Sequence, residues 1–156
     1  MLNKFGGHAM AAGVTLDGDK LQGFMQAFDL EVQRHVARDE LRGVIQSDGE
    51  LTAEDFNQTT AEQLRHASPW GQAFPEPLFD GVFALQSRRI VGEKHLKVQL
   101  LPPELPHSID GIAFNQTDQD WPAEVSQVNV AYQLDINEFR GNRLLQLLIR
   151  HIEPIV

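Results

Sequence analysis

The stretch VNVAYQLDIN, residues 128–137, alternates apolar and polar side chains along most of its length. Successive side chains of a β-strand point to opposite faces, so this alternation predicts a long strand with one apolar and one polar face. The apolar face would carry Val128, Val130, Tyr132, Leu134 and Ile136. The polar face would carry Asn129, Gln133, Asp135 and Asn137. We therefore expect a sheet packed on one side against a core that includes Tyr132.

Three further extended runs precede this strand. Residues 79–91 form the first, and a turn at Gly92 and Glu93 leads into the second, residues 94–100. In that second run Leu96, Val98 and Leu100 alternate with His95, Lys97 and Gln99. Residues 109–115 form the third run, and RGNR at 140–143 is a turn after the long strand. Such runs between turn residues predict four antiparallel strands.

The last element, residues 144–152, fits two structures. Its apolar residues form a helical stripe, and leucine favours a helix. These residues are Leu144, Leu145, Leu148, Ile149 and Ile152. They could equally form a strand buried on both faces, because the four preceding strands need a fifth to close the sheet. Five strands in about 75 residues are typical of a small barrel of the OB type, which binds oligonucleotides or oligosaccharides.

The first half of the chain is predicted to be mainly helical. Residues 19–36 carry apolar side chains at steps of three and four, and Asp17 or Asp19 can cap the start. A capping box at 52–55 predicts a second helix, which ends near Ala67 because Pro69 disfavours helical geometry before it. The proline-rich segment 69–77 is then a rigid connector, where we place the main boundary of the chain.

The composition is that of a globular protein, with 42% apolar and 22% charged residues. The absence of cysteine excludes disulfides and thiolate metal sites and indicates the cytoplasm, and no apolar run approaches the ~20 residues of a membrane helix. A net charge of −9 argues against coating nucleic acid by bulk charge. Basic residues nevertheless gather within 86–100 and 139–151. These two stretches could place a nucleic-acid strand on one face, or they could be solvated strand edges.

The segment GGHAMAAG, residues 6–13, could hold an anion. Paired glycines let backbone amides approach an anion closely, and His8 could donate a hydrogen bond to a phosphate oxygen. The alternative is a glycine turn followed by a small-residue packing element, with His8 facing solvent.

Several segments together resemble one family of nucleases. GGHAMAAG resembles the signature of the DHHA1 domain, the second domain of DHH-family phosphoesterases, which include nanoRNA and cyclic-dinucleotide hydrolases. The rest of the chain resembles RecJ, the 5′→3′ single-strand-specific exonuclease family of that superfamily. The similar blocks, which appear in the family's order, are PWG at 69–71 with PEPLF at 75–79, VGEKHLK at 91–97, DGIAFN at 110–115 and LDINEFRGNR at 134–143.

The resemblance implies an α+β fold: the remnant of a DHHA1 α/β domain, then a small five-stranded antiparallel OB-type barrel. Residues 1–42 would be the C-terminal part of DHHA1, 43–79 a helical lead-in and proline-rich connector, and 80–156 the OB domain. It also favours a strand over a helix for 144–152. The chain would then begin partway through DHHA1, with Met1 an artificial boundary or an internal methionine. One departure, Phe74 where the family often has asparagine, affects only a local turn contact.

The resemblance also implies roles for individual residues. Gly6, Gly7 and His8 would bind a substrate phosphate, with Lys4 either assisting or solvated. The residues expected to bind DNA are Arg88, Arg89, Lys94, His95 and Lys97 on the barrel face and Arg140 and Arg143 beside the Gly141–Asn142 turn. The aromatic residues Trp70, Phe74 and Phe79 could stack on bases, although residues beside prolines in a connector also suit burial.

RecJ-like catalysis uses an N-terminal DHH domain that binds two divalent metals, manganese or magnesium, which activate water and stabilise the leaving oxygen. The six histidines of this chain are scattered, without paired helical spacing or a surrounding carboxylate cluster. They are His8, His35, His66, His95, His107 and His151. We therefore expect no catalytic residue, metal or cofactor within these residues, and no nuclease activity from them alone.

Two functions follow as hypotheses. The first is the DNA-holding, C-terminal part of a RecJ-like exonuclease in DNA repair and recombination, with single-stranded DNA as partner and a single-strand-binding protein as a candidate partner. The second is a non-catalytic OB-type module that recognises single strands, or saccharide, without hydrolysis. A cyclic-dinucleotide hydrolase is disfavoured, because there DHHA1 normally ends the chain. Strand polarity and metal use come from the resemblance alone.

Overall fold

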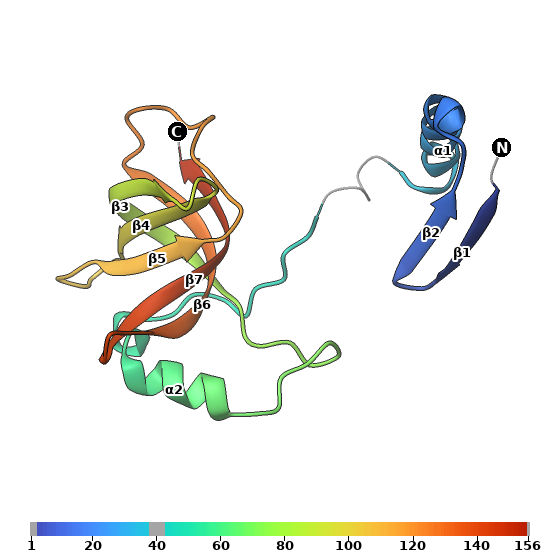
Figure 1. The fold of residues 1–156 in the computed structure, drawn as a ribbon. Coiled ribbons are helices and arrows are strands. Elements are labelled where there is room, and N and C mark those ends of the chain that lie inside the picture. The colour runs from blue at the N-terminus through green and yellow to red at the C-terminus, as the bar shows by residue number, and fades with distance from the viewer. Residues whose placement is uncertain (1–2, 38–42, 156) are drawn as a thin grey trace. The chain divides into compact units, whose positions relative to one another are not determined.

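The computed structural model describes residues 3–37 and 43–155. The chain divides into two compact units, Met1–Val44 and Ile45–Val156, each drawn in Figure 1. The sequence placed the main boundary at the connector 69–77, whereas the connector lies inside the second unit. It is held there because the Gln133 amide of the long strand donates to Glu76 at 3.2 Å and the Trp70 indole donates to the Leu64 carbonyl at 2.9 Å.

The first unit is a hairpin followed by a helix. Strands β1 (Lys4–His8) and β2 (Ala11–Thr15) pair antiparallel, a 3-10 turn spans Gly18–Lys20, and α1 spans Leu21–His35, where a helix was predicted. Gly6 and Gly7 lie within β1 rather than in a turn. Glycine suits this position because a Cβ on Gly7 would lie 2.9 Å from the Cβ of Ala12. No described side chain of this unit is buried.

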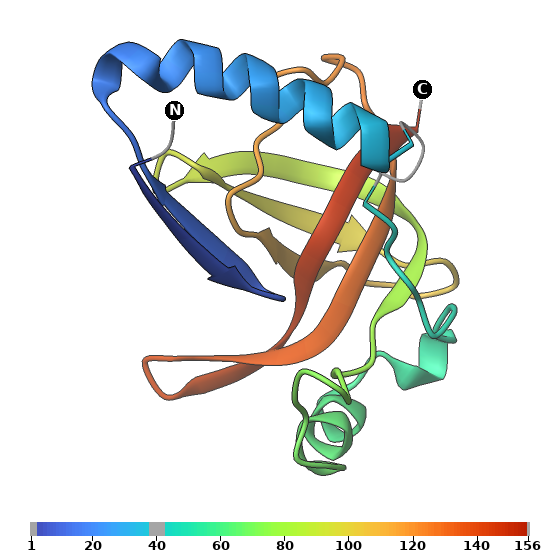
Figure 2. The ribbon, with the colours of Figure 1, turned by 90° about the vertical axis from the view of Figure 1, so that its right-hand side faces the viewer.

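The second unit is built around five strands, as predicted. They are β3 (Phe79–Val91), β4 (His95–Leu101), β5 (Ile109–Ala113), β6 (Gln127–Phe139) and β7 (Asn142–Ile155). They form a closed barrel in the order β3-β4-β5-β7-β6, which Figures 1 and 2 show from two sides. The strand predicted for 144–152 is therefore confirmed against the helical alternative. Because β6 and β5 flank β7, its backbone groups have strand partners on both sides.

The expectation of a wholly antiparallel barrel was wrong at one pair. β5 and β7 run parallel, with Gly111 opposite Leu147 and Ala113 opposite Ile149. The reason is geometric: strand direction cannot alternate all the way round a closed ring of five, so one neighbouring pair must be parallel. Gly111 also allows close packing here, because a Cβ on it would lie 2.7 Å from the Ile149 Cδ1 atom and 2.9 Å from the Val98 Cγ2 atom.

The apolar face predicted for 128–137 is the centre of the barrel core. Val128, Val130, Tyr132, Leu134 and Ile136 are each at most 3% exposed. The Tyr132 ring lies 5.4 Å from that of Phe83, 6.0 Å from Phe56 and 6.2 Å from Phe79 between centroids. Burial raises the pKa of the Tyr132 phenol well above its ordinary range. Tyr132 is therefore a core residue, as expected.

The helix predicted from residue 52 is divided in two. The capping box forms between Thr52 and Asp55, but it caps only the 3-10 turn Ala53–Asp55. Helix α2 (Gln58–His66) starts afresh, with the Asn57 side chain accepting from the Thr60 amide at 2.8 Å. The break arises because Phe56 enters the core between the two segments.

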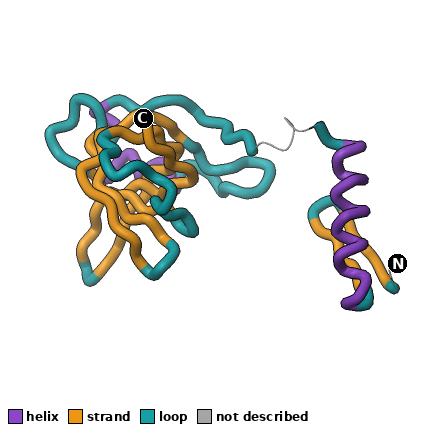
Figure 3. Tube along the Cα trace, turned by 90° about the horizontal axis from the view of Figure 1, so that it is seen from above, coloured by secondary structure: helices purple, strands orange, loops and turns teal. Residues whose placement is uncertain are grey.

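Helix α2 lies at one end of the barrel (Figures 1 and 3). The Arg65 side chain ties the helix to β6 through Asp135 and the Ile136 carbonyl. Within the described ranges, no helix is both long and apolar enough to cross a lipid bilayer.

Candidate nucleic-acid interface

The outer surface of β3, β4 and β5 carries three of the seven basic residues predicted to bind DNA, which are Arg89, His95 and Lys97. Leu96, Val98 and Leu100 of β4 point into the core, so the residues between them point outward. Strand register aligns these outward residues with their neighbours in three cross-strand rows. The rows are Ser87–Gln99–Asp110, Arg89–Lys97–Ile112 and Val91–His95–Phe114, with Phe114 directly after β5. We call these nine residues the outer face.

The charged groups of the outer face differ in how firmly they are held. The Lys97 ammonium lies 2.8 Å from the Asp110 carboxylate, and both side chains are about one third exposed. Arg89 is exposed, and it lines a shallow depression of about 180 Å³ with Ser87, Lys97 and Gln99. Lys94 is exposed in the turn that joins β3 to β4. Arg89 and Lys94 are therefore accessible cations, while Lys97 is shared with Asp110.

The His95 side chain accepts a hydrogen bond from the backbone that follows β5. Its Nδ1 atom accepts from the Asn115 backbone N–H at 3.0 Å, so the neutral ring carries its proton on Nε2. The ring packs edge-to-face on Phe114, with centroids 5.0 Å apart. Phe114 itself is 53% exposed. No role was predicted for this phenylalanine from the sequence, although it continues the outward alternation of Asp110 and Ile112.

Arg88 lies on the opposite side of β3 from Arg89. It pairs in register with the buried Val98, and its guanidinium forms an ion pair with Asp118 at 3.0 Å. It also donates to the Pro122 carbonyl at 3.0 Å and lies 5.4 Å from the centroid of the Trp121 ring. These contacts hold the segment 114–126 between β5 and β6, so Arg88 is not one of the outer-face cations.

The two arginines at the β6–β7 hairpin have different surroundings. Arg140 (φ 52°) and Gly141 (φ 81°) form a two-residue turn, and the exposed Arg140 guanidinium lies over the Phe139 ring. Arg143 lies on β7, 2.7 Å from Glu62 of α2 and 3.2 Å from Glu138. The hydrogen bond that Arg143 donates to Glu62 raises the pKa of its guanidinium. Arg143 therefore fastens α2 to the hairpin, while Arg140 is free to meet a ligand.

The predicted phosphate-binding residues lie in the first unit. Gly6, Gly7 and His8 are exposed along β1, and the His8 Nδ1 atom accepts from the Met10 backbone N–H at 3.3 Å. This leaves the His8 Nε2–H group as the available donor.

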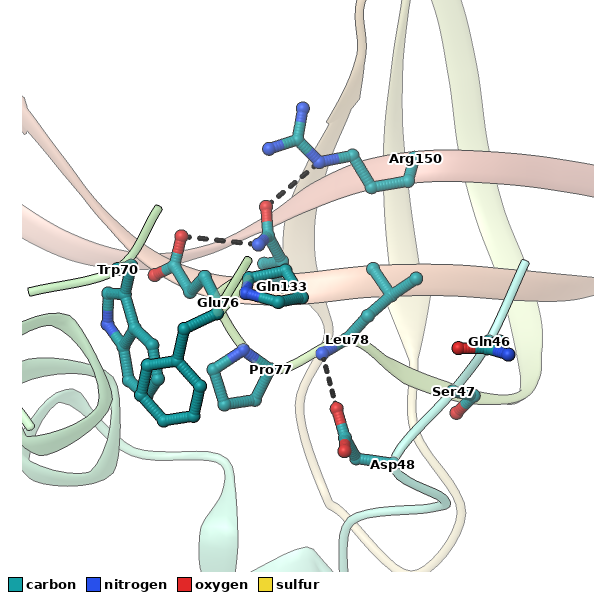
Figure 4. Close-up of a pocket in the computed structure, with 11 residues that line it drawn as sticks. Gln46, Ser47, Asp48, Trp70, Glu76, Pro77, Leu78, Gln133 and Arg150 are labelled. Carbon is teal, nitrogen blue, oxygen red and sulfur yellow. Dashed lines mark hydrogen bonds between the residues drawn. The ribbon is translucent and has the colours of Figure 1, made fainter. Parts of the chain in front are cut away.

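A separate groove of about 970 Å³ lies along the connector, lined in part by residues 46–48 and 74–78. Figure 4 shows Gln133 at its wall between Arg150 and Glu76, bonded to both, with Leu78 bonded to Asp48. The Trp70 and Phe74 rings lie 4.9 Å apart and contact each other, and Phe79 is in the core. Of the three connector aromatics considered for stacking, Phe74 is the exposed one, at 56%.

The family model of the RecJ OB domain matches residues 47–151. The chain belongs to the RecJ OB-domain family. The matched residues include all of β3 to β6 and all but the last few residues of β7.

The whole chain is also similar to curated RecJ proteins. It is 51% identical to the single-stranded-DNA-specific exonuclease RecJ of Dickeya dadantii and 51% identical to that of Escherichia coli. Each comparison covers 99% of this chain and 27% of the relative. The chain therefore spans about a quarter of the length of these RecJ relatives.

The fold is that of solved RecJ structures. RecJ from Thermus thermophilus in complex with Mg²⁺ matches 99% of this chain and 24% of that one, with a TM-score of 0.66 and 25% identity. The Mn²⁺ complex of the same protein gives a TM-score of 0.65 at 23% identity. In the described part of the present RecJ-family chain, no three histidine or carboxylate side chains are grouped so that they could hold a metal ion.

Proposed function

We propose that this chain binds single-stranded DNA through the outer face and serves as the DNA-holding, C-terminal region of a RecJ-like 5′→3′ exonuclease. The observation that carries the proposal is the placement of Arg89 beside Lys97 on one surface of a RecJ OB barrel, with the exposed Lys94 in the adjoining turn. In this proposal, a DHH domain of the RecJ-like enzyme, which binds manganese or magnesium and is not among these residues, hydrolyses the phosphodiester bond.

The position of this surface on the barrel supports the proposal. In OB barrels, the second and third strands and the turns joining strands one to two and four to five bind oligonucleotides. Here these elements are β4 and β5, the turn with Lys94 and the turn with Arg140.

The charge distribution supports it as well. The outer face and its turn carry Arg89, Lys94 and Lys97 against Asp110 and Glu93, on a chain whose net charge is −9. A phosphate backbone would be attracted to this patch and repelled by most of the remaining surface. Binding would therefore be local and strongly dependent on salt.

His8 is proposed to act separately from the barrel. With Nδ1 occupied by the Met10 amide, its Nε2–H group can donate to a phosphate oxygen, and the exposed Gly6 has open space where a Cβ would lie. In a RecJ-like enzyme this would hold a substrate phosphate beside the metals.

The test is a double charge reversal, Lys94→Glu with Lys97→Glu, measured by fluorescence anisotropy with a single-stranded oligonucleotide at several salt concentrations. Each full phosphate contact contributes a log–log salt slope of about −0.7, so losing both cations should flatten the slope by up to about 1.4. Affinity at low salt should fall by about tenfold or more. The fold should survive, because Leu96 and Val98 keep the core face of β4.

The matched control is Lys20→Glu with Arg34→Glu in the first unit, which changes net charge by the same amount. A bulk-charge effect would weaken binding equally in both variants. If the outer-face variant binds like the unaltered chain, the DNA-binding surface is not on β3–β5 and the proposal fails.

A further inference from the structure

Phe114 is an exposed aromatic residue at the end of the outer face. It follows β5 directly, lies beside His95 across the strands, and is 53% exposed. The turn that carries Lys94 ends one residue before His95 on the neighbouring strand. A half-exposed ring therefore stands next to the cations proposed to bind phosphate.

The Phe114 ring is also fixed in place. Its edge-to-face contact with His95 has an interplanar angle of 78°. The next residue, Asn115, adopts a left-handed conformation (φ 56°) that directs its N–H to the His95 Nδ1 atom. The imidazole also lies beside the β3–β4 turn, since a Cβ on Gly92 would lie 3.4 Å from the His95 Cδ2 atom. The imidazole thus joins the ends of β4 and β5 and holds the phenylalanine ring.

We propose that Phe114 is a platform on which an unpaired nucleobase stacks, and that His95 is a positioning residue that holds this platform. The inference rests on the proposed single-strand binding and extends it from phosphate to base recognition. Stacking needs a base face that a duplex does not offer, and it tolerates any base. The outer face would therefore distinguish single strands from duplexes through Phe114 and not through its cations.

The experiment compares two probes on the full chain: an oligonucleotide with bases and one of equal length with abasic sites. Phe114→Leu keeps an apolar contact with His95 but removes the aromatic face, and Phe114→Trp restores one. The leucine variant should bind the base-containing probe about 5- to 100-fold more weakly, as expected for the loss of one stacked base. Its affinity for the abasic probe should change less than about twofold, and its salt slope should stay the same.

The role of His95 is tested by a double-mutant cycle. If His95 acts through Phe114, then His95→Ala combined with Phe114→Leu should bind no more weakly than Phe114→Leu alone. His95→Asn, whose side-chain oxygen can accept from the Asn115 N–H, should recover part of the affinity lost in His95→Ala. Additive losses, or equal losses on the abasic probe, would show that His95 acts on DNA directly or only on folding.

The outcomes also separate this inference from the proposed function. If Phe114→Leu weakens both probes equally or neither probe, the platform is excluded, while a loss in the Lys94 and Lys97 variant would still support the binding face. If charge reversal and Phe114→Leu both leave binding unchanged, both proposals fail.

Discussion

At the scale of single residues, the ion pair between Lys97 and Asp110 limits what the outer face can bind. A phosphate must compete with a carboxylate 2.8 Å from the ammonium. A partly exposed pair of this kind contributes only about 0–1 kcal/mol. DNA phosphate can therefore displace Asp110 from Lys97, but breaking the ion pair lowers the affinity for DNA. Asp110 therefore weakens the interaction that Lys97 provides.

Neutralising this carboxylate should strengthen DNA binding. We expect Asp110→Asn to bind a single-stranded oligonucleotide about two- to fivefold more tightly at low salt, because the free energy of the ion pair is no longer lost on binding. The log–log salt slope should steepen by up to about 0.7 as Lys97 becomes a full phosphate contact. Glu153→Gln on β7 is the control for net charge. Equal gains in the two variants would mean that Asp110 acts only through overall charge.

At the scale of elements, the adjacent residues Arg88 and Arg89 of β3 contact different parts of the barrel unit. A β-bulge between Leu85 and Ser87 shifts the register, so Arg88 is opposite the buried Val98 and Arg89 is opposite the outward Lys97. If the register of Leu85 continued through Gln86 without a bulge, Arg88 would lie opposite Lys97 and Arg89 opposite the buried Leu96, so their sides would be exchanged. The bulge thereby assigns Arg88 to the segment 114–126 and Arg89 to the outer face.

This division predicts opposite effects for two similar substitutions. Arg88→Ala should lower the free energy of unfolding by about 1–3 kcal/mol, because Asp118 loses its ion pair and the Pro122 carbonyl loses its donor. Arg89→Ala should change it by less than about 0.5 kcal/mol, yet weaken single-strand binding. Urea denaturation and anisotropy on both variants measure this. Equal stability of the two variants would contradict the assigned role of Arg88.

At the scale of the whole molecule, the two units differ in how many of their apolar side chains are buried. The barrel unit has a continuous core from Phe56 to Ile152, whereas the described residues of the first unit include none that is buried. On α1 the apolar residues Leu21, Met25 and Phe28 are at least half exposed. Cooperative stability depends chiefly on buried apolar surface, so the units should differ in stability.

Hydrogen exchange of the isolated chain should show this difference. Amides of α1 and of the β1–β2 hairpin are expected to exchange about a thousandfold faster than those of β6. The reason is that local opening of the first unit exposes little new apolar surface. The sheet amides of β3 and β7 provide the internal reference for the barrel. Protection of α1 equal to that of β6 would show that the first unit is stabilised as strongly as the barrel.

The sequence by itself determined the elements whose pattern is local. Alternation along most of 128–137 predicted β6 and its core face, and apolar steps of three and four predicted α1, because each periodicity is a property of neighbouring residues. The resemblance of motifs along the chain identified the RecJ family, which the family model and the RecJ relatives confirmed. The basic residues of β4 and its turn were also recognisable in advance, since Lys97 alternates with the core residues Leu96 and Val98.

Only the tertiary structure decided how these elements meet. Residues 144–152 carry a helical stripe, yet they form β7 because β5 and β6 leave a place for one strand between them. Closure of five strands imposed the parallel β5–β7 pair, and one bulge decided which of Arg88 and Arg89 faces outward. The contact of His95 with Phe114 joins two motifs through strand register. Such pairings depend on residues far apart in the chain, and a local pattern of side chains does not specify them.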